Sequence, residues 1–214
     1  MSFNSIPKIT YFDNILITPK KKSIMSRLGY QNRSTALQTK DLSFSEEAIS
    51  LGLALCRNQG ALGRFTITDR SNGSVSLPDG NSFESRQLAK LLIHSDEALL
   101  IAGTTGSEIT TAISREMEQG NASRAVILDA VASCSADMIL DWLMETFNKM
   151  LRREGKKLTR RRFSPGFGDL PISDQAVVFR LLGLERLNLH LTDAMMLVPE
   201  KSVLAIAGIE RITN

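Results

Sequence analysis

The chain has 214 residues, of which 43% are hydrophobic and 23% are charged, and its formal net charge at pH 7 is +3. This length and composition are typical of one globular domain with a sizeable core, or of one domain with an appendage. No apolar run reaches the roughly 18 residues of a membrane span, and the N-terminus lacks the apolar centre of a signal peptide. We therefore expect a cytoplasmic protein with no membrane partner.

Cysteine and histidine are too few and too scattered for a zinc site. Cys56 and Cys134 lie far apart, and neither shares a metal-ligand spacing with His94 or His190. A structural zinc ion needs four such side chains at short, regular spacings. Both cysteines stand in apolar, helix-like contexts, so we expect buried free thiols and no bound metal.

Basic residues gather in two stretches of the chain, 20–40 and 152–162. Stretches of this kind form either a solvated face or a surface for an acidic partner, such as an anionic cofactor, a protein or a nucleic acid. Proteins that bind single-stranded nucleic acid interleave aromatic and basic side chains. Only Phe163 and Phe167 lie close to the second stretch, and we expect no nucleic-acid partner.

The first half of the chain begins without a clear apolar period. We predict that residues 1–40 form an extension that packs on a domain of residues 41–214. A capping-box pattern and helical apolar spacing predict a helix over 43–60, which ends at a glycine. Alternating apolar residues predict a strand over 63–68, and a run rich in Ser, Asn and Gly predicts a loop over 69–80.

The middle of the chain alternates helices with one apolar strand. Apolar spacing predicts helices over 85–93, 107–120 and 123–151, and a continuous apolar run predicts a buried strand over 97–102. The turn at 103–106 (Gly-Thr-Thr-Gly) joins this strand to the next helix. An anion can bind at such a helix start. The turn lacks both the dinucleotide pattern and the phosphate-binding lysine, so a plain strand-to-helix turn stays the alternative.

Two acidic residues lie four positions apart in the longest predicted helix. Asp137 and Asp141 therefore share one face of that helix. Carboxylates on a helix are ordinarily solvated. A pair on one face of a helix that is otherwise largely buried also fits a role facing a cation.

The segment 162–171 cannot be helical. Pro165, Gly166, Gly168 and Pro171 predict an extended, turning segment whose glycines let a ligand approach the backbone closely. Beyond it we predict a helix capped by Ser173, then strands from Leu187 to Leu191 and from Val203 to Ile209. Helices and strands that mix without a regular strand-helix-strand repeat predict an α+β fold.

The order of these features resembles a known family. Residues 162–167 (Arg-Phe-Ser-Pro-Gly-Phe) are similar to the Arg-x-x-Pro-Gly-Tyr motif of the C-terminal activation domain of cobalamin-dependent methionine synthase, which binds S-adenosylmethionine. Residues 191–203 resemble a later Leu-Thr-Glu-Ser…Pro-x-x-Ser-Val pattern, and residues 136–141 resemble Ala-Asp-x-x-x-Glu. The resemblance covers roughly residues 99–209 and is closest to free-standing relatives of that domain.

The resemblance implies a twisted, mainly antiparallel sheet flanked by helices, with S-adenosylmethionine as the bound cofactor. An arginine can grip the ligand's carboxylate through two parallel hydrogen bonds, and an acidic side chain can accept from its ammonium group. Backbone groups of the bend would meet the adenine and ribose. The cofactor-binding residues implied in this way are Arg162, Ser164, Pro165, Gly166, Phe167, Asp141 and Asp137.

The function implied is that of a stand-alone reactivation module. S-adenosylmethionine would donate a methyl group in the reductive remethylation of a cobalamin that a partner protein holds. The partner implied is a corrinoid-binding methyltransferase, or a methionine synthase without this domain, and a flavodoxin-like protein is the candidate electron donor. In this function the protein contributes binding and orientation.

Two departures from the family motif support an alternative. Phe167 replaces a tyrosine and Asp141 is one methylene shorter than glutamate. A non-catalytic docking protein, which binds a corrinoid protein but has lost S-adenosylmethionine, fits these changes. A basic nucleic-acid binder is the third hypothesis.

Overall fold

The computed structural model describes residues 9–30, 39–71 and 73–212. Within them, the central feature is a five-stranded sheet in the order β1-β2-β5-β9-β6, in which every neighbouring pair is antiparallel. Its strands are β1 (Ile9–Phe12), β2 (Gln59–Thr66), β5 (Ser95–Thr104), β6 (Lys156–Leu158) and β9 (Ser202–Arg211). Two short ribbons pair β3 (Ser74–Ser76) with β4 (Ser82–Glu84), and β7 (His190–Leu191) with β8 (Leu197–Val198).

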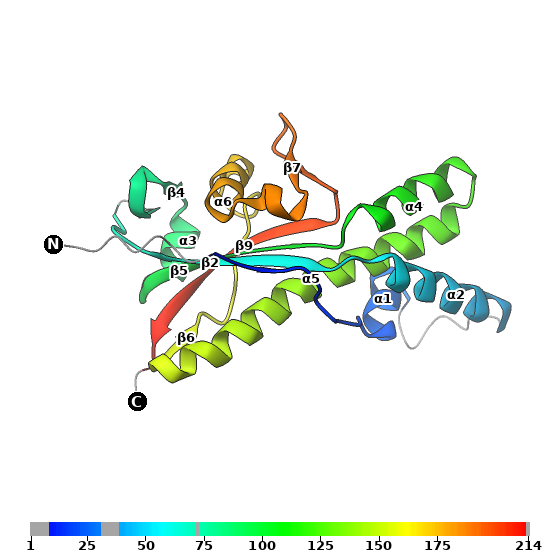
Figure 1. Cartoon of the computed structure of the whole chain (residues 1–214), viewed down its shortest axis with the longest axis horizontal. Helices are drawn as coiled ribbons and strands as arrows, with labels where there is room; N and C mark the ends of the chain where they lie inside the picture. Colours follow the sequence, from blue (N-terminus) through cyan, green and yellow to red (C-terminus); the bar gives the residue numbers. More distant parts are fainter. Residues whose placement is uncertain (1–8, 31–38, 72, 213–214) are drawn as a thin grey trace.

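Helices cover both faces of this sheet. The long helix α5 runs diagonally across one face, and α6 lies on the other, below the β7–β8 ribbon (Figure 1). The α-helices are α1 (Lys21–Arg27), α2 (Thr39–Leu55), α3 (Arg86–Leu91), α4 (Ser107–Glu118), α5 (Ala122–Leu151) and α6 (Gln175–Leu182). Short 3-10 turns are η1 (Pro78–Gly80), η2 (Arg152–Glu154), η3 (Ile172–Asp174) and η4 (Leu184–Leu187).

The central strands are apolar on both faces because each face is buried. Along β5, Leu100 packs into the core beneath α3 and α6, whereas its neighbours Leu99 and Ile101 pack against α5. Successive side chains of a strand point to opposite faces, so a strand covered on both sides needs a continuous apolar run. This explains the continuous apolar run of residues 98–102, which follows the charged Glu97.

A glycine of β5 lies directly against helix α5. A Cβ atom at Gly103 of β5 would lie 2.6 Å from Cγ2 of Ile139 on α5. No real side chain tolerates that separation, so the glycine lets the helix backbone come near the strand. This contact fixes the position of α5, and with it the face that carries Asp137 and Asp141.

The predicted α+β class is confirmed, as are the predicted strand 97–102 within β5 and the predicted helices that became α4 and α5. Several local predictions are wrong. The predicted helix 43–60 ends at Leu55 and Gly60 lies in β2, and the predicted loop 69–80 contains the short strand β3. Ser173 is not a helix cap: it lies inside η3, and α6 starts after Asp174 without a side-chain cap. Leu187 belongs to η4, because the chain turns through a left-handed Asn188 before the short strand β7 begins.

The N-terminal segment contributes to both the sheet and the core. Strand β1 pairs with β2, and the side chains of Ile15 and Ile24 are fully buried. The division between residues 1–40 and 41–214 stays a prediction, and Arg33 of the first basic stretch lies outside the described residues. Across the described part of the chain, no helix is both long and apolar enough to cross a membrane.

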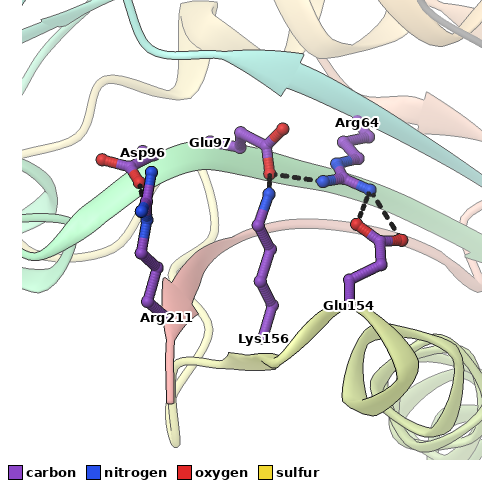
Figure 2. A network of polar contacts seen from close by, with 6 residues as sticks. All are labelled: Arg64, Asp96, Glu97, Glu154, Lys156 and Arg211. Carbon is purple, nitrogen blue, oxygen red and sulfur yellow. Dashed lines mark hydrogen bonds and ion pairs between the residues drawn. The ribbon is translucent and has the colours of Figure 1, made fainter. Parts of the chain in front are cut away.

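An ion network joins the strands at one end of the sheet (Figure 2). The carboxylate of Glu97 on β5 lies 2.7 Å from Nη2 of Arg64 on β2 and 3.1 Å from Nζ of Lys156 on β6. Arg64 also contacts Glu154 of η2 at 2.9 Å. Burial raises the pKa of Glu97, but its hydrogen bonds from the two cations outweigh burial, and the pKa lies below its ordinary value.

Candidate ligand-binding site

One stripe along α5 carries the polar side chains of the candidate site. Cys134, Asp137, Asp141 and Met144 follow one another at spacings of three or four residues, so they lie on one face of the helix. The side chains of Asp137 and Asp141 are 54% and 67% exposed. Both carboxylates are therefore open to solvent on a helix whose other faces pack on the sheet and on α2 and α4.

The segment before the bend is attached to the edge of β9. The N–H of Phe163 donates to the carbonyl of Ile206 at 2.8 Å, and the N–H of Ile206 donates back at 2.7 Å. Upstream, Thr159 and Gly208 exchange two further hydrogen bonds, of 2.8 Å and 2.9 Å. The side chain of Phe163 packs into the core on the α6 side. The preceding residue, Arg162, reaches α5 on the other side.

Arg162 and Asp141 form an ion pair with each other. Arg162 also donates to the backbone carbonyl of Asp137 at 3.4 Å, and its Nη1 lies 3.9 Å from the sulfur of Met144. Its side chain is 25% exposed. A second arginine, Arg27 of α1, contacts the carboxylate of Asp137 at 3.1 Å. Each carboxylate thus has its own guanidinium, and the two arginines come from distant segments.

The bend after Arg162 closes on itself. The N–H of Gly166 donates to the carbonyl of Leu170 at 2.9 Å, and the N–H of Phe167 donates to that of Ser164 at 3.2 Å. Gly166 has a φ of +89°, and a Cβ there would lie 2.9 Å from Cδ1 of Ile172. The positive φ therefore favours glycine at this position. Because these two N–H groups are used within the bend, they are not free for a ligand.

Asp169 anchors the far end of the bend to the start of α3. Its carboxylate accepts hydrogen bonds from the hydroxyl of Ser85 and from the N–H of Arg86, the latter at 2.9 Å. The hydrogen bond from Ser85 is the main cause that lowers the pKa of Asp169. With Phe163 held by β9 and Asp169 held by α3, both ends of the bend are fixed.

The structure thus brings together three of the seven predicted residues, Arg162, Asp141 and Asp137. Ser164 follows Arg162 by two positions, which places its Cα within about 7 Å of that of Arg162. Pro165 is buried, and Phe167 exposes 68% of its surface. For the four residues of the bend, contact with a ligand stays a prediction.

Two residues of the cluster were absent from the sequence-based prediction. Met144 continues the helical spacing of Asp137 and Asp141, so that pattern could have found it. Arg27 lies 110 positions from Asp137, and no local pattern connects the two. Only the packing of α1 against α5 brings them together.

Comparison with solved structures finds a similar fold. The MetH reactivation domain bound to AdoHcy matches 97% of this chain and 80% of its own, with a TM-score of 0.67 and 12% sequence identity. No protein-family model matches the sequence, and a search of curated proteins finds no match either. The chain therefore has the fold of a methionine synthase activation domain, as the resemblance predicted.

Proposed function

We propose that this chain binds S-adenosylmethionine at the cluster of Arg162, Asp141 and Asp137 and acts as a reactivation module for a corrinoid protein. One observation carries the proposal: a guanidinium and a helical carboxylate meet at the sheet edge, directly before a fixed proline-glycine bend. The neighbour of the same fold was crystallised with AdoHcy, the demethylated form of the proposed ligand.

The charges of the cluster fit the amino-acid end of this ligand. In the structure Arg162 and Asp141 neutralise each other. A ligand that carries both a carboxylate and an ammonium group can separate this pair: its carboxylate becomes the partner of Arg162, and its ammonium group becomes the partner of Asp141. Arg162 would then hold the ligand's carboxylate and Asp141 its ammonium, so that no charge is left unpaired. This matters because an unpaired, partly buried charge costs several kcal/mol.

The sulfonium group is the one charge of the ligand that has no partner in this exchange. Asp137 lies one helical turn from Asp141 and is held by Arg27 through an ion pair between two half-exposed side chains. Such pairs contribute only about 0.2–1 kcal/mol, so the carboxylate can turn to a second cation at little cost. We assign Asp137 to the sulfonium for this reason.

The reaction proposed is the reductive remethylation of a cobalamin that another protein holds. S-adenosylmethionine supplies an activated methyl group for a corrinoid cobalt that a separate reductant has reduced. Arg162, Asp141 and Asp137 bind the donor and orient its methyl group toward the partner. The partner proposed is a corrinoid-binding methyltransferase, or a methionine synthase that lacks this domain, and a flavodoxin-like protein is the proposed reductant.

Calorimetry with S-adenosylmethionine tests the ligand. Arg162→Ala should weaken binding by on the order of 2–4 kcal/mol, the scale for leaving one partner of a charged pair without the other. Arg211→Ala is the matched control, because it also removes an arginine that is ion-paired with an aspartate, here at 3.2 Å and away from the cluster. Equal affinity in the Arg162 and Arg211 variants would contradict the site, and no binding to the unmodified chain would contradict the ligand.

A methyl-transfer assay tests the function. A methyltransferase that contains oxidised corrinoid is mixed with a reductant and with S-adenosylmethionine labelled in its methyl group. We expect label on the corrinoid only when this chain is present, and less label with Arg162→Ala. Label that arrives equally fast without this chain would exclude the reactivation function.

A docking protein without S-adenosylmethionine is the second candidate. The observation that favours it is that Arg162 and Asp141 already satisfy each other in the absence of any ligand. Capture of the corrinoid partner to the same extent with and without S-adenosylmethionine would support docking. Capture that depends on the ligand would support the first proposal.

A further inference from the structure

A cavity of about 590 Å³ opens at the end of the sheet opposite the ion network of Figure 2. Its walls come from residues 13–14 after β1, residues 56–59 from the end of α2 to the first residue of β2, residues 106–108 at the start of α4, residues 187–188 at the end of η4, and Pro199. None of its lining residues belongs to α5 or to the Arg162 cluster. It is therefore a separate site.

The cavity offers no free positive charge. Its arginine, Arg57, makes a two-point ion pair with Glu108, with Nε 3.1 Å from Oε1 and Nη2 2.9 Å from Oε2. The third nitrogen of Arg57 donates to the carbonyl of Ala54 at 2.9 Å. Since Asp13 adds a second carboxylate, the charges of the lining residues sum to −1. The charged side chains of the lining therefore do not favour a phosphate or a carboxylate.

The remaining polar side chains of the lining have hydrogen-bonding capacity to spare. Within the described residues, no hydrogen bond or ion pair engages the side chains of Asp13, Asn14, Gln59 or Asn188. A carboxamide both donates and accepts, and a carboxylate accepts at two oxygens. Hydroxyl groups on adjacent carbons both donate and accept hydrogen bonds. An acidic side chain commonly accepts hydrogen bonds from the hydroxyl groups of a ribose.

Two backbone features hold the walls in place. Asn188 has a left-handed φ of +56° and ends η4, between the buried side chains of Leu187 and Leu189. Gly106 has a φ of +78°, and a Cβ there would lie 3.0 Å from Cβ of Arg57. The glycine thus leaves room for the arginine that pairs with Glu108.

We infer that this cavity is a binding site for an uncharged vicinal diol, of the kind carried by a free sugar or by the ribose of a nucleoside. Its volume lies within the roughly 300–1,000 Å³ of small-molecule sites. Asp13 accepts from the two hydroxyls, and the carboxamides of Asn14, Gln59 and Asn188 pair with the other polar groups of the ligand. The buried Leu187 and the partly buried Pro199 contact its carbon atoms.

Amide-resolved NMR titration of the full chain tests the inference with three probes: methyl ribofuranoside, adenosine and 2′-deoxyadenosine. We expect saturable shifts at residues 57–59, 106–108 and 187–188 with the furanoside, with adenosine, or with both. The furanoside alone identifies a free sugar, and adenosine alone identifies a nucleoside. 2′-Deoxyadenosine, which lacks the diol, should bind at least tenfold more weakly than adenosine.

The variant Asp13→Asn should also lower the affinity about tenfold, the scale of one hydrogen bond to a charged group. Asp79→Asn, in an exposed turn elsewhere, should leave it unchanged. Arg162→Ala should leave the chemical-shift changes caused by the diol probes unchanged. The experiment therefore distinguishes failure of the proposed S-adenosylmethionine site from failure of the diol site. The inference is overturned if neither diol probe gives saturable shifts, if the deoxynucleoside binds equally well, or if the two aspartate variants behave alike.

Discussion

At the scale of single residues, the candidate site depends on how two neighbouring carboxylates are paired. Asp141 is held by Arg162, whose side chain is only 25% exposed, whereas Asp137 is held by Arg27, whose side chain is 47% exposed. The pair with Arg27 is the more solvated one and is the easier to separate. This difference is the basis of the roles proposed for the two acids, in which Asp141 would accept from the ligand's ammonium group and Asp137 would face its sulfonium.

The variant Asp137→Asn tests this division of roles. We expect S-adenosylmethionine to bind about fivefold more weakly, since losing one exposed charge contact costs about 1 kcal/mol. S-adenosylhomocysteine has no sulfonium charge and should bind as before. Calorimetry with both ligands measures the difference. Arg27→Gln is the control, because it breaks the same ion pair but keeps the carboxylate of Asp137. If Asp137→Asn weakened the binding of both ligands equally, the assignment would be contradicted.

At the scale of elements, the segment 159–163 connects the edge of β9 to the site. The buried hydroxyl of Thr159 accepts from the N–H of Gly208 at 2.9 Å and donates to the carbonyl of Arg161 at 2.8 Å. One side chain therefore fixes the backbone directly before Arg162. Sequence patterns did not single out this threonine, because its partner on β9 lies 49 positions away.

The variant Thr159→Val removes both hydrogen bonds while keeping a side chain of similar shape. We expect the free energy of unfolding to fall by about 1–3 kcal/mol, since a buried N–H loses its acceptor. Urea denaturation measures this change. Thr110→Val on α4 removes a solvated hydroxyl bond of 2.9 Å and should cost less. A Thr159 variant as stable as the Thr110 variant would show that the segment is held in another way.

At the scale of the whole molecule, Glu97 joins three parts of the fold that are far apart in sequence. It contacts Arg64 of β2 and Lys156 of β6, and through Arg64 it is linked to Glu154 after α5 (Figure 2). Its side chain is 18% exposed, so these contacts are screened less than ordinary surface pairs.

The pH dependence of stability follows from the lowered pKa of Glu97. A carboxylate with a lowered pKa in the folded state stabilises the protein above its unfolded pKa, about 4.3 for glutamate, and loses this contribution as the pH falls through the folded pKa. Glu97→Gln should therefore cost about 1.5–3 kcal/mol at pH 7 and progressively less below about pH 4.3.

Denaturation of the unmodified chain and of the Glu97→Gln variant, from pH 7 to below about pH 4.3, measures the difference in their free energies of unfolding. Asp96→Asn, which breaks the exposed neighbouring pair with Arg211, is the control and should cost less than about 1 kcal/mol. A Glu97→Gln difference that stays constant down to the lowest pH would mean that packing, and not charge, is what the variant removes.

Much of the fold could be predicted because its main elements have local causes. The apolar run 98–102 within the predicted strand 97–102 indicates a strand buried on both faces, and the spacing within α5 indicates a long helix with Asp137 and Asp141 on one side. The predictions failed where tertiary contacts override local preference. Leu187 alternates with Leu189 as in a strand, and both leucines are buried in the core as that pattern predicts, but Leu187 lies in the turn η4 and Asn188 is left-handed, so the backbone is not extended there.

The sequence by itself determined the α+β class, the helix that carries the two acids, and the bend at 164–170, because each follows from the period of apolar residues or from proline and glycine. Only the tertiary structure decided that Arg162 pairs with Asp141, that Arg27 pairs with Asp137, and that four separate segments enclose a polar cavity with Pro199. The physical reason is distance along the chain. These contacts join residues from 21 to more than 100 positions apart, which no local period encodes.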